Sequence, residues 1–301
     1  MQDVSIILPY HNREDFLPRT LRSIISNARW KLQIILVDSQ STDSSREICL
    51  NFEKKISSSD IEIINISSPN TGASLARNVG LSAATSPYVF FFDSDDNFSP
   101  FFLDDALKCF CTSSDSLDIV AAPTEMVFLD GKTKVRYTSR VSSVEDQILS
   151  GMLSTQGMLF RREFIKQCGG WNEQLPKWND WELGIRLLKQ RARVMWLNSH
   201  YHRIYQHPSS LTYMSYSDDF AAKQLALKNV VPIVKYNVRE KKALAVRALL
   251  LAEDMRKAEF FNAATLLEKD FPLPSFIRFL LRSCMRIYNK GIWRIAKILI
   301  R

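Results

Sequence analysis

Two aspartates, Asp93 and Asp95, follow the apolar run 88–92 and are separated only by Ser94. Carboxylates beside an apolar strand cost free energy unless a cation or hydrogen bonds compensate them. Mg²⁺ and Mn²⁺ take oxygen ligands and are often shared between carboxylates and substrate phosphates. Such an ion would neutralise a departing diphosphate. The same residues are also common in turns, so we predict a divalent-metal site and keep a plain loop as the alternative.

Two further residues have types and positions that suit nucleotide binding. Asp38 ends an apolar run and can accept hydrogen bonds from a base or a ribose. Its alternative role is to cap the next helix, although Ser41 and Asp43 already supply that function. Arg77 lies in a predicted helix that follows Gly72, so it could reach a diphosphate or a base. A lone arginine on a helix is more often only solvated.

A third acidic position, Asp180, opens a predicted helix. An acid in the first turn is stabilised by the helix dipole, which keeps it ionised. It could also act as a general base towards an acceptor hydroxyl. Trp178 and Trp181 flank it and offer either platforms for sugar rings or core packing. His207, in a polar stretch further along, could ligate a metal or contact a phosphate; its alternative is simple exposure.

The spacing of apolar residues predicts alternating strands and helices over the first ninety residues. The predicted strands are 4–9, 32–37, 61–66 and 88–92, and the predicted helices are 14–27, 43–55 and 73–84. This alternation is typical of an α/β fold with a mostly parallel sheet flanked by helices. Ligands of such sheets bind beyond the carboxyl ends of the strands. We therefore assign Pro9, Tyr10, Asn12 and Ser94 to the nucleotide site with Asp38, Arg77 and Asp93.

The rest of the chain is less regular. We expect a strand-rich stretch over 118–160, helices over 161–168 and 180–191, a strand over 194–197 and a loop over 200–213. From 217 to 268 the pattern is helical, with breaks predicted near Pro232 and Asn262. Pro272 and Pro274 then precede a last helix. These shifts predict three segments: a main domain over 1–213, a helical extension over 214–270 and a basic amphipathic helix over 271–301.

The composition of the 301-residue chain, 46% hydrophobic and 24% charged, is ordinary for a globular protein. We expect no signal peptide, because Met1 leads almost directly into a strand, and no run long enough to span a membrane. The five cysteines are scattered and odd in number. We interpret them as reduced thiols of a cytoplasmic protein.

The net charge of +8 is concentrated at the C-terminal end. Residues 271–301 hold seven basic side chains and no acidic one, whereas residues 1–214 have 23 basic and 24 acidic side chains, a net charge of −1. A nucleic-acid enzyme would more often spread basic charge over its main domain, so we expect no nucleic-acid partner. The basic residues recur about every four positions, which predicts a helix suited to the surface of an anionic membrane. Docking on the protein itself is the alternative.

Six segments together resemble family 2 glycosyltransferases, which have the GT-A fold. The resemblance covers about residues 1–213, and the segments stand in the order that the family has. They are Ser5–Asn12 (SIILPYHN), Ile35–Asp43 (ILVDSQSTD), Gly72–Gly80 (GASLARNVG), Phe92–Asp96 (FDSDD), Gly169–Glu173 (GGWNE) and Asn179–Arg186 (NDWELGIR). Each motif is modest alone, and the ordered set is specific.

The resemblance implies an inverting enzyme that moves a sugar from a nucleotide diphosphate to an acceptor hydroxyl. Asp38 would contact the nucleobase and Asp93 the ribose, and Asp95 would hold Mn²⁺ or Mg²⁺, with His207 assisting. Asp180 would be the catalytic base. The family prior favours UDP. A saccharide or lipid-linked acceptor and cell-surface polysaccharide or glycolipid synthesis are the expected setting, with the protein cytoplasmic and peripheral to the inner face of the membrane.

The chain departs from the family pattern at three positions. Ser39 stands where a second acid is usual, Gln40 replaces a glycine, and Asn179 replaces the first acid of the pair before the helix. These departures support the alternative of a catalytically degenerate module that only binds a nucleotide sugar or a partner. A pyrophosphorylase or dehydrogenase is disfavoured, because the first turn lacks the glycine pattern of dinucleotide binding.

Overall fold

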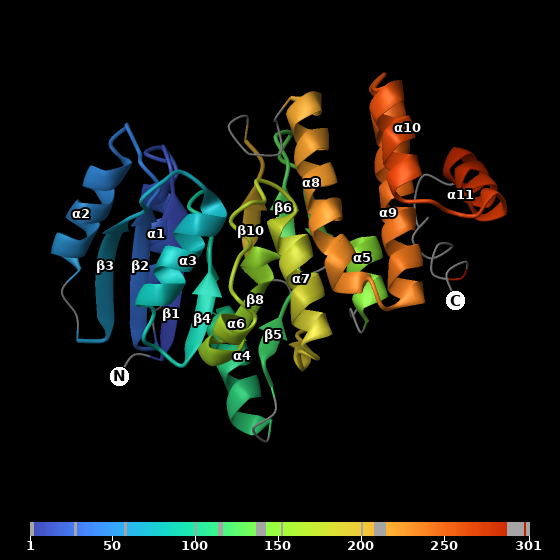
Figure 1. Ribbon diagram of the computed structural model, residues 1–301. Coiled ribbons are helices and arrows are strands. Elements are labelled where there is room, and N and C mark those ends of the chain that lie inside the picture. Colours follow the sequence, from blue (N-terminus) through green and yellow to red (C-terminus); the bar gives the residue numbers. More distant parts are fainter. Residues whose placement is uncertain are drawn as a thin grey trace. The chain divides into compact units, whose positions relative to one another are not determined.

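The computed structural model divides the chain into two compact units (Figure 1). It describes residues 3–26, 29–56, 59–99, 101–113, 117–136, 143–151, 153–199, 201–207, 215–287 and 298. The first unit comprises Met1–Arg140, Leu153–Pro176 and Gln190–Ser210, and the second comprises Val141–Met152, Lys177–Lys189 and Leu211–Arg301. The predicted three segments were defined by expected role rather than by compactness, and they stay a prediction.

The first unit is built on a seven-stranded sheet in the order β3-β2-β1-β4-β8-β5-β9. The strands β1 to β4 run parallel to one another, and β8 is antiparallel to both β4 and β5. A second sheet has the order β10-β6-β7. The strand bounds are β1 Val4–Tyr10, β2 Leu32–Asp38, β3 Ile61–Ser67, β4 Tyr88–Phe91, β5 Ile119–Ala121, β6 Thr124–Val127, β7 Thr133–Arg136, β8 Met158–Arg161, β9 Val194–Trp196 and β10 Arg203–Tyr205.

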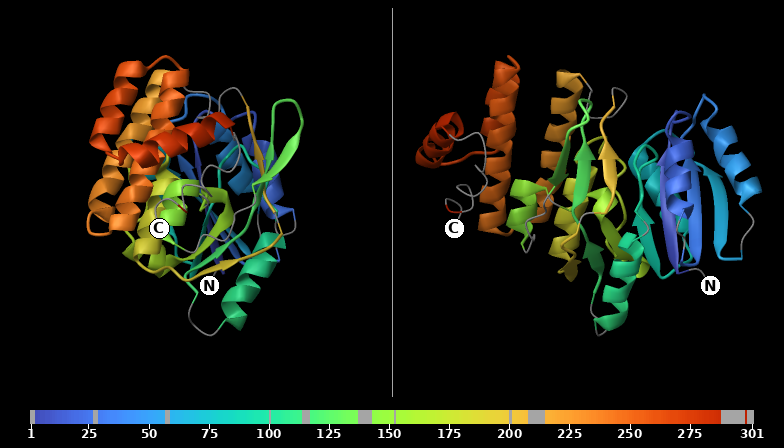
Figure 2. Two further views of the ribbon diagram at one scale, coloured as in Figure 1. Left: turned by 90° about the vertical axis from the view of Figure 1, so that its right-hand side faces the viewer. Right: turned by 180° about the vertical axis from the view of Figure 1, so that it is seen from behind.

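Helices cover both faces of the large sheet (Figure 2). Apolar side chains of α1, α2 and α4 join one core cluster with alternate residues of β1 and β2. The helix α3 packs on the opposite face, where Gly80 lies so close to β1 that an added Cβ would stand 2.4 Å from Ile7 Cγ2. The helix bounds are α1 Leu17–Ile25, α2 Ser45–Lys55, α3 Ala73–Ala83, α4 Phe101–Thr112 and α6 Arg162–Gln167, with a short 3-10 turn η1 at Thr155–Gly157.

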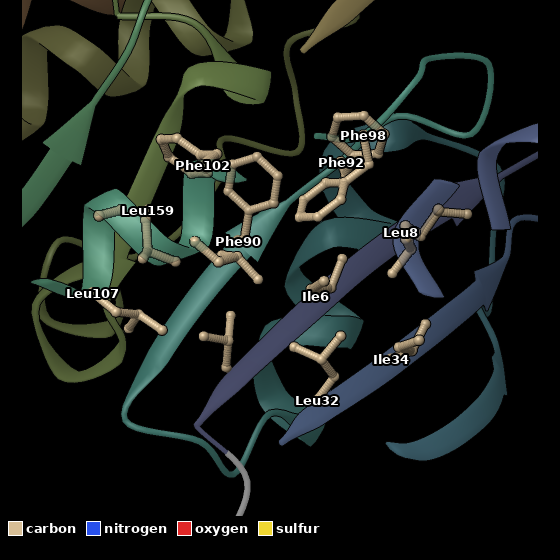
Figure 3. Close-up of a cluster of buried hydrophobic side chains, with 14 of the residues drawn as sticks. Ile6, Leu8, Leu32, Ile34, Phe90, Phe92, Phe98, Phe102, Leu107 and Leu159 are labelled. Carbon is tan, nitrogen blue, oxygen red and sulfur yellow. The ribbon is translucent and has the colours of Figure 1, made fainter. Parts of the chain in front are cut away.

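The core beside β4 is aromatic (Figure 3). Phe90, Phe92, Phe98 and Phe102 surround the ring of His202, with ring centroids 4.9 to 5.3 Å from it. His202 is fully buried, and its Nδ1 accepts a hydrogen bond from the Ser99 amide at 3.1 Å. Burial lowers the pKa of this imidazole to about 3. The ring is therefore neutral at physiological pH and acts as a core residue.

The second unit is helical. Packing joins α5 with α7 and α9, α7 with α8, and α9 with both α8 and α10. The helix bounds are α5 Val144–Ser150, α7 Asn179–Lys189, α8 Tyr216–Val234, α9 Val238–Lys257, α10 Phe261–Asp270 and α11 Ser275–Ile287. The predicted α/β fold with additional C-terminal helices is confirmed by this architecture.

The sequence predicted the first seven elements to within a few residues, and several later expectations were wrong. The helix α4 was not predicted. The helix α5 lies inside the stretch expected to be strand-rich, and β10 lies inside the expected loop. The break predicted near Pro232 is confirmed, because α8 ends two residues after it at Val234. The break predicted near Asn262 is also confirmed: it lies at 258–260, where Glu259 has φ of 68°.

The described part of α11 is docked on its own unit. Leu281 is fully buried, while Arg278 and Arg282 form ion pairs with Glu268 at 3.5 and 2.7 Å. Phe276 and Phe279 remain 69% and 67% exposed. The other basic residues predicted for this helix lie mostly outside the described residues. Among the helices that the structure describes, none combines the length and the apolar character that crossing a membrane requires.

Candidate active site

Three neighbouring strands, β1, β2 and β4, end at one edge of the large sheet. The register pairs Tyr10 with Asp38 and Ile7 with Phe91, so the loops that follow these strands emerge side by side. Asn12 joins the first two loops, because its Oδ1 accepts a hydrogen bond from the Thr42 amide at 2.8 Å. Its φ of 50° is one that asparagine tolerates better than most residues. The predicted convergence of polar groups at this edge is therefore present.

Asp38 shapes the loop after β2. Its side chain is 5% exposed, and Oδ1 accepts a hydrogen bond from the Ser41 amide at 2.9 Å. Ser39 Oγ accepts one from the Gly72 amide at 3.0 Å, which fixes the start of α3. Gln40 has φ of 61°, and its side-chain amide donates to the Pro69 carbonyl at 2.8 Å. Ser39 and Gln40, which depart from the family pattern, thus keep this loop in place with their own hydrogen bonds.

Pro9 and Tyr10 face the interior rather than the edge. Tyr10 is 3% exposed and packs in the cluster that contains Cys49 of α2. Burial, together with Cys49 and Asp38, raises the pKa of the Tyr10 phenol well above its usual value. Burial also raises the pKa of the Cys49 thiol to about 12. The prediction that Pro9 and Tyr10 bind nucleotide stays a prediction, and it can concern only their backbone atoms.

Asp93 is held by two side chains from distant parts of the sequence. Arg77 donates from NH2 to Asp93 Oδ1 at 2.7 Å, and Gln156 of η1 donates to Oδ2. Arg77 is 5% exposed, and its guanidinium lies 4.6 Å from the Trp171 ring centroid. Its Nε and NH1 are buried and have no hydrogen-bond partner among the described residues. The structure therefore brings Arg77 and Asp93 together at the carboxyl edge of the sheet, and their role in nucleotide binding stays a prediction.

Asp95 faces the imidazole of His207. The distance from Asp95 Oδ2 to His207 Nε2 is 2.8 Å, and Arg13 Nε lies 3.4 Å from the same oxygen. The His207 ring stacks against Phe16 at 4.4 Å between centroids, and its side chain is only 9% exposed. The two predicted metal ligands are therefore brought together, although 112 residues separate them in sequence.

Asp96 and Thr20 fix the backbone of this loop. Thr20 Oγ1 lies 3.0 and 2.8 Å from the carbonyl oxygens of Ser94 and Asp96. Asp96 is 1% exposed, and its Oδ1 accepts a hydrogen bond from the Tyr205 amide at 3.0 Å. Burial, and then the charges of Asp95 and Asp93, raise the pKa of Asp96 well above its usual value. Asp96 thereby ties β10, which leads to His207, to the loop of residues 93–96, which we call the aspartate loop.

The donor set at Asp95 suits a metal that is shared with a substrate. A carboxylate and an imidazole lie within hydrogen-bond distance of each other, and no cluster of three or more metal-ligating side chains occurs among the residues that the structure describes. Mg²⁺ and Mn²⁺ often take one or two protein ligands and complete their shell with substrate phosphates and water. The residues therefore fit such an ion, which Asp95 and His207 would hold.

Asp180 belongs to the second unit. It lies in the first turn of α7, where its Oδ1 accepts a hydrogen bond from the Trp181 amide at 2.8 Å. Asn179 Oδ1 in turn accepts from the Asp180 amide at 2.8 Å. The position at a helix N-terminus is as predicted, and the role as catalytic base stays a prediction.

Sequence reasoning missed five residues that contribute to the site: Gln156, Arg13, Arg19, Asp96 and Tyr205. Arg19 donates to the Asp95 carbonyl and lies 4.0 Å from the Tyr205 ring centroid. Arg13 directly follows the motif at the end of β1, which was a usable signal. Nothing in the sequence marks Gln156, because only the antiparallel return of β8 beside β4 brings it to Asp93.

Comparison with known proteins decides the family. The family model described as "Glycosyl transferase family 2" matches residues 5–169, more than half of the chain. The chain belongs to glycosyl transferase family 2. The match includes Asp38, Arg77, Asp93 and Asp95, whereas Asp180 and His207 lie beyond its end.

Among curated relatives, the "Minor teichoic acid biosynthesis protein GgaA" of Bacillus subtilis is 29% identical over 202 residues, which cover 63% of this chain and 44% of that protein. "Glycosyltransferase GlyA" of Streptococcus pneumoniae is 41% identical over 93 residues, which cover 31% of this chain and 13% of that protein. The chain thus spans less than half of the length of these relatives.

Solved structures support the fold. The TarS 1–349 structure from S. aureus, in complex with UDP-GlcNAc, has a TM-score of 0.62 at 19% identity and covers 81% of this chain and 71% of that one. The mannosyltransferase PcManGT from Pyrobaculum calidifontis, with GDP-Man and Mn²⁺, has the same TM-score at 15% identity and covers 100% of this chain and 86% of that one. Both confirm the predicted GT-A-like architecture.

Proposed function

We propose that this chain is a metal-dependent, inverting glycosyltransferase that moves a sugar from a UDP-sugar to an acceptor hydroxyl. One observation carries the proposal: Asp93, paired with Arg77, and Asp95, paired with His207, lie in one loop at the carboxyl edge of the sheet. This is where ligands of open α/β sheets bind. The family membership and the nucleotide sugars bound in the two structural neighbours support the same activity.

Each residue has a distinct part in the proposed reaction. Asp38 and Asp93 accept hydrogen bonds from the base and the ribose. The positive charge of Arg77 holds Asp93 in place and attracts the negatively charged donor. Asp95 and His207 would hold Mn²⁺ or Mg²⁺, which when bound would stabilise the leaving diphosphate. Asp180 takes the proton of the acceptor hydroxyl as its oxygen attacks the anomeric carbon from the side opposite the diphosphate.

We propose a saccharide or lipid-linked acceptor in the synthesis of a cell-surface polymer. The support is the names of the relatives, several of which refer to teichoic or teichuronic acid biosynthesis. An acceptor of this kind fits a protein associated with an anionic membrane, and the basic C-terminal segment and exposed Phe276 and Phe279 of α11 are consistent with that location. The expected cytoplasmic location belongs to the same proposal.

Calorimetric titration of UDP with and without Mn²⁺ tests the site. We expect Mn²⁺-dependent binding by the wild type and a loss of about ten-fold or more in affinity for Asp95→Ala, because the metal loses its carboxylate ligand. Asp130→Ala is the matched control, since Asp130 is exposed in the turn before β7, where its carboxylate pairs with Lys132.

The same titration, combined with an assay of sugar transfer, distinguishes an active enzyme from a catalytically degenerate module. Binding of UDP followed by transfer from a UDP-sugar, with the transfer lowered to a small residual rate by Asp180→Asn, supports the proposal. Binding without transfer to any acceptor or to water would favour the module suggested by Ser39 and Asn179. Absence of binding to UDP, GDP and dTDP alike would overturn the proposed activity.

A further inference from the structure

The helix that carries Asp180 begins with an unusual backbone conformation. Trp178 has φ of 56°, in the left-handed region that bulky residues rarely adopt. Its carbonyl oxygen accepts a hydrogen bond from the Glu182 amide at 3.0 Å, so Trp178 acts as the N-cap of α7. The conformation of this one residue therefore sets where the first turn of α7, which carries Asp180, begins.

Three side chains pack around the Trp178 ring. The guanidinium carbon of Arg247, from α9, lies 4.5 Å from the ring centroid. The Trp181 ring lies 5.1 Å away, and Lys223 Nζ of α8 lies 5.8 Å away. Cation–π contacts of this kind stabilise an aromatic ring more strongly when they are desolvated. Two of the three side chains, Arg247 and Lys223, thus come from the C-terminal helices α9 and α8.

Arg247 is largely buried without a full set of partners. Its NH1 donates to the Leu149 carbonyl of α5 at 3.3 Å, whereas its Nε is buried and has no hydrogen-bond partner among the described residues. Burial lowers the pKa of its guanidinium to about 10, so it stays charged at neutral pH. A buried cation with an unsatisfied donor costs free energy. A methionine would fill similar space without that cost, so the charge is not explained by packing alone.

Helices α5 and α8 also hold the residues on either side of Asp180. Trp181 Nε1 donates to the Ile148 carbonyl at 3.0 Å, and Gln147 Nε2 donates to the Trp181 carbonyl at 3.3 Å. Lys177, just before Trp178, pairs with Asp219 of α8, which also pairs with Lys223. The residues on either side of Asp180 are therefore fixed from α5, α8 and α9.

We propose that the C-terminal helices orient the catalytic base, with Arg247 as the positioning residue. Arg247 holds Trp178 in its left-handed conformation, and Trp178 in turn holds the first turn of α7 and the carboxylate of Asp180. This inference rests on the proposed function, because it takes Asp180 to be the base. It assigns the helical extension a part in the reaction rather than only in acceptor or membrane binding.

The test is a double-mutant cycle between Arg247 and Asp180. We expect Arg247→Met to lower kcat for sugar transfer about 100-fold, since a base displaced by about 1 Å costs that much. The Kd for UDP and Mn²⁺ should change less than two-fold. Arg247→Lys should recover much of the rate through its remaining cation–π contact. Arg239→Met, at an exposed position of the same helix, should behave as the wild type.

The cycle distinguishes positioning from a merely structural effect. In an Asp180→Asn background, Arg247→Met should have no further effect on transfer, because both changes act through one group. An equal loss in both backgrounds would overturn the inference, as would an Arg247→Met enzyme with the wild-type rate. A Trp178→Phe variant, which keeps an aromatic ring, should lose less rate than Arg247→Met. If Asp180→Asn alone transfers at the wild-type rate, the proposed base is wrong and the inference falls with it.

Discussion

At the scale of single residues, the aspartate loop is held from four sides. Asp93 is fixed by Arg77 and Gln156, Asp95 faces His207, and Asp96 is tied to Tyr205. The carboxylates are therefore oriented by charge-assisted hydrogen bonds and are not free to rotate towards solvent. A ligand meets groups that are already in place, which reduces the entropy lost on binding.

The Arg77–Asp93 pair gives the first residue-scale prediction. Arg77→Met should weaken Mn²⁺-dependent binding of UDP about ten-fold, because a carboxylate that is only 28% exposed loses its partner and the ligand loses a cation. Calorimetry would measure the change. Arg29→Met, at a 69% exposed side chain, is the control and should bind normally. A Kd for Arg77→Met equal to that of the wild type would exclude the assigned role.

His202 gives a prediction about pH. Its folded-state pKa of about 3 is below the unfolded value of 6.5, so the unfolded state binds the proton first as the pH falls. This contribution to stability is complete above pH 6.5 and is lost towards pH 3, at about 1.4 kcal/mol per pH unit. His202→Asn keeps an acceptor near the Ser99 amide and removes the titration. Chemical denaturation between pH 4 and 6 should then show a shallower pH dependence; an unchanged slope would contradict the assignment.

At the scale of elements, the closeness of α3 to the sheet constrains the site. Gly80 lies against Ile7 of β1 and Val37 of β2, and the same helix carries Arg77. The helix can approach the strands only because position 80 lacks a side chain. Arg77 reaches Asp93 as a result of this short separation.

We predict that Gly80→Ala destabilises the protein by about 1 to 3 kcal/mol, since the new methyl group would overpack a well-filled core. The gain in helix propensity, about 1 kcal/mol, offsets only part of this cost. Ser82→Ala, at an exposed position of the same helix, should change the free energy of unfolding by less than about 0.5 kcal/mol. Urea titration of both variants decides between them; equal midpoints would contradict the packing argument.

The sequence predicted the parallel half of the sheet because its strands are continuous apolar runs that end in polar motifs. It predicted the Asp95–His207 pairing only through the family resemblance, since 112 residues separate the two. Gln156 could not be predicted as a site residue, because its position depends on the antiparallel strand β8. This strand lies next to β4 in the sheet but is separated from it by a long stretch of sequence. The helix α4 was not predicted, although it follows directly on the aspartate loop. The strand β10 was predicted to be loop because its stretch is polar, and pairing with β6 decides its conformation.

At the scale of the whole chain, the positive charge of the C-terminal segment is partly neutralised. Arg282 pairs with Glu253 at 2.8 Å and with Glu268 at 2.7 Å, and Arg256 pairs with both acids. These arginines attract an anionic surface less than free side chains would. The apolar contribution of α11 to membrane binding then falls mainly to Phe276 and Phe279 among its described residues.

We predict that the protein cosediments with phosphatidylglycerol vesicles and that the double change Phe276→Ser and Phe279→Ser lowers the partition coefficient at least ten-fold, because each ring contributes on the order of 2 kcal/mol when buried. Leu266→Ser, at a 61% exposed position of α10, is the control. Cosedimentation unaffected by the phenylalanine changes would show that α11 is not the contact.

A close backbone contact joins the two ends of the segment between β5 and β8. The Ala122 amide donates to the Gly157 carbonyl at 2.8 Å, and a Cβ at Gly157 would stand only 2.5 Å from the Ala122 oxygen. Since doubling the length of a closed loop costs only about 0.6 kcal/mol, the turn at 128–132 between β6 and β7 can vary in length while Gln156 stays beside Asp93. We therefore expect insertions in this turn to leave the Ala122–Gly157 contact and the position of Gln156 unchanged.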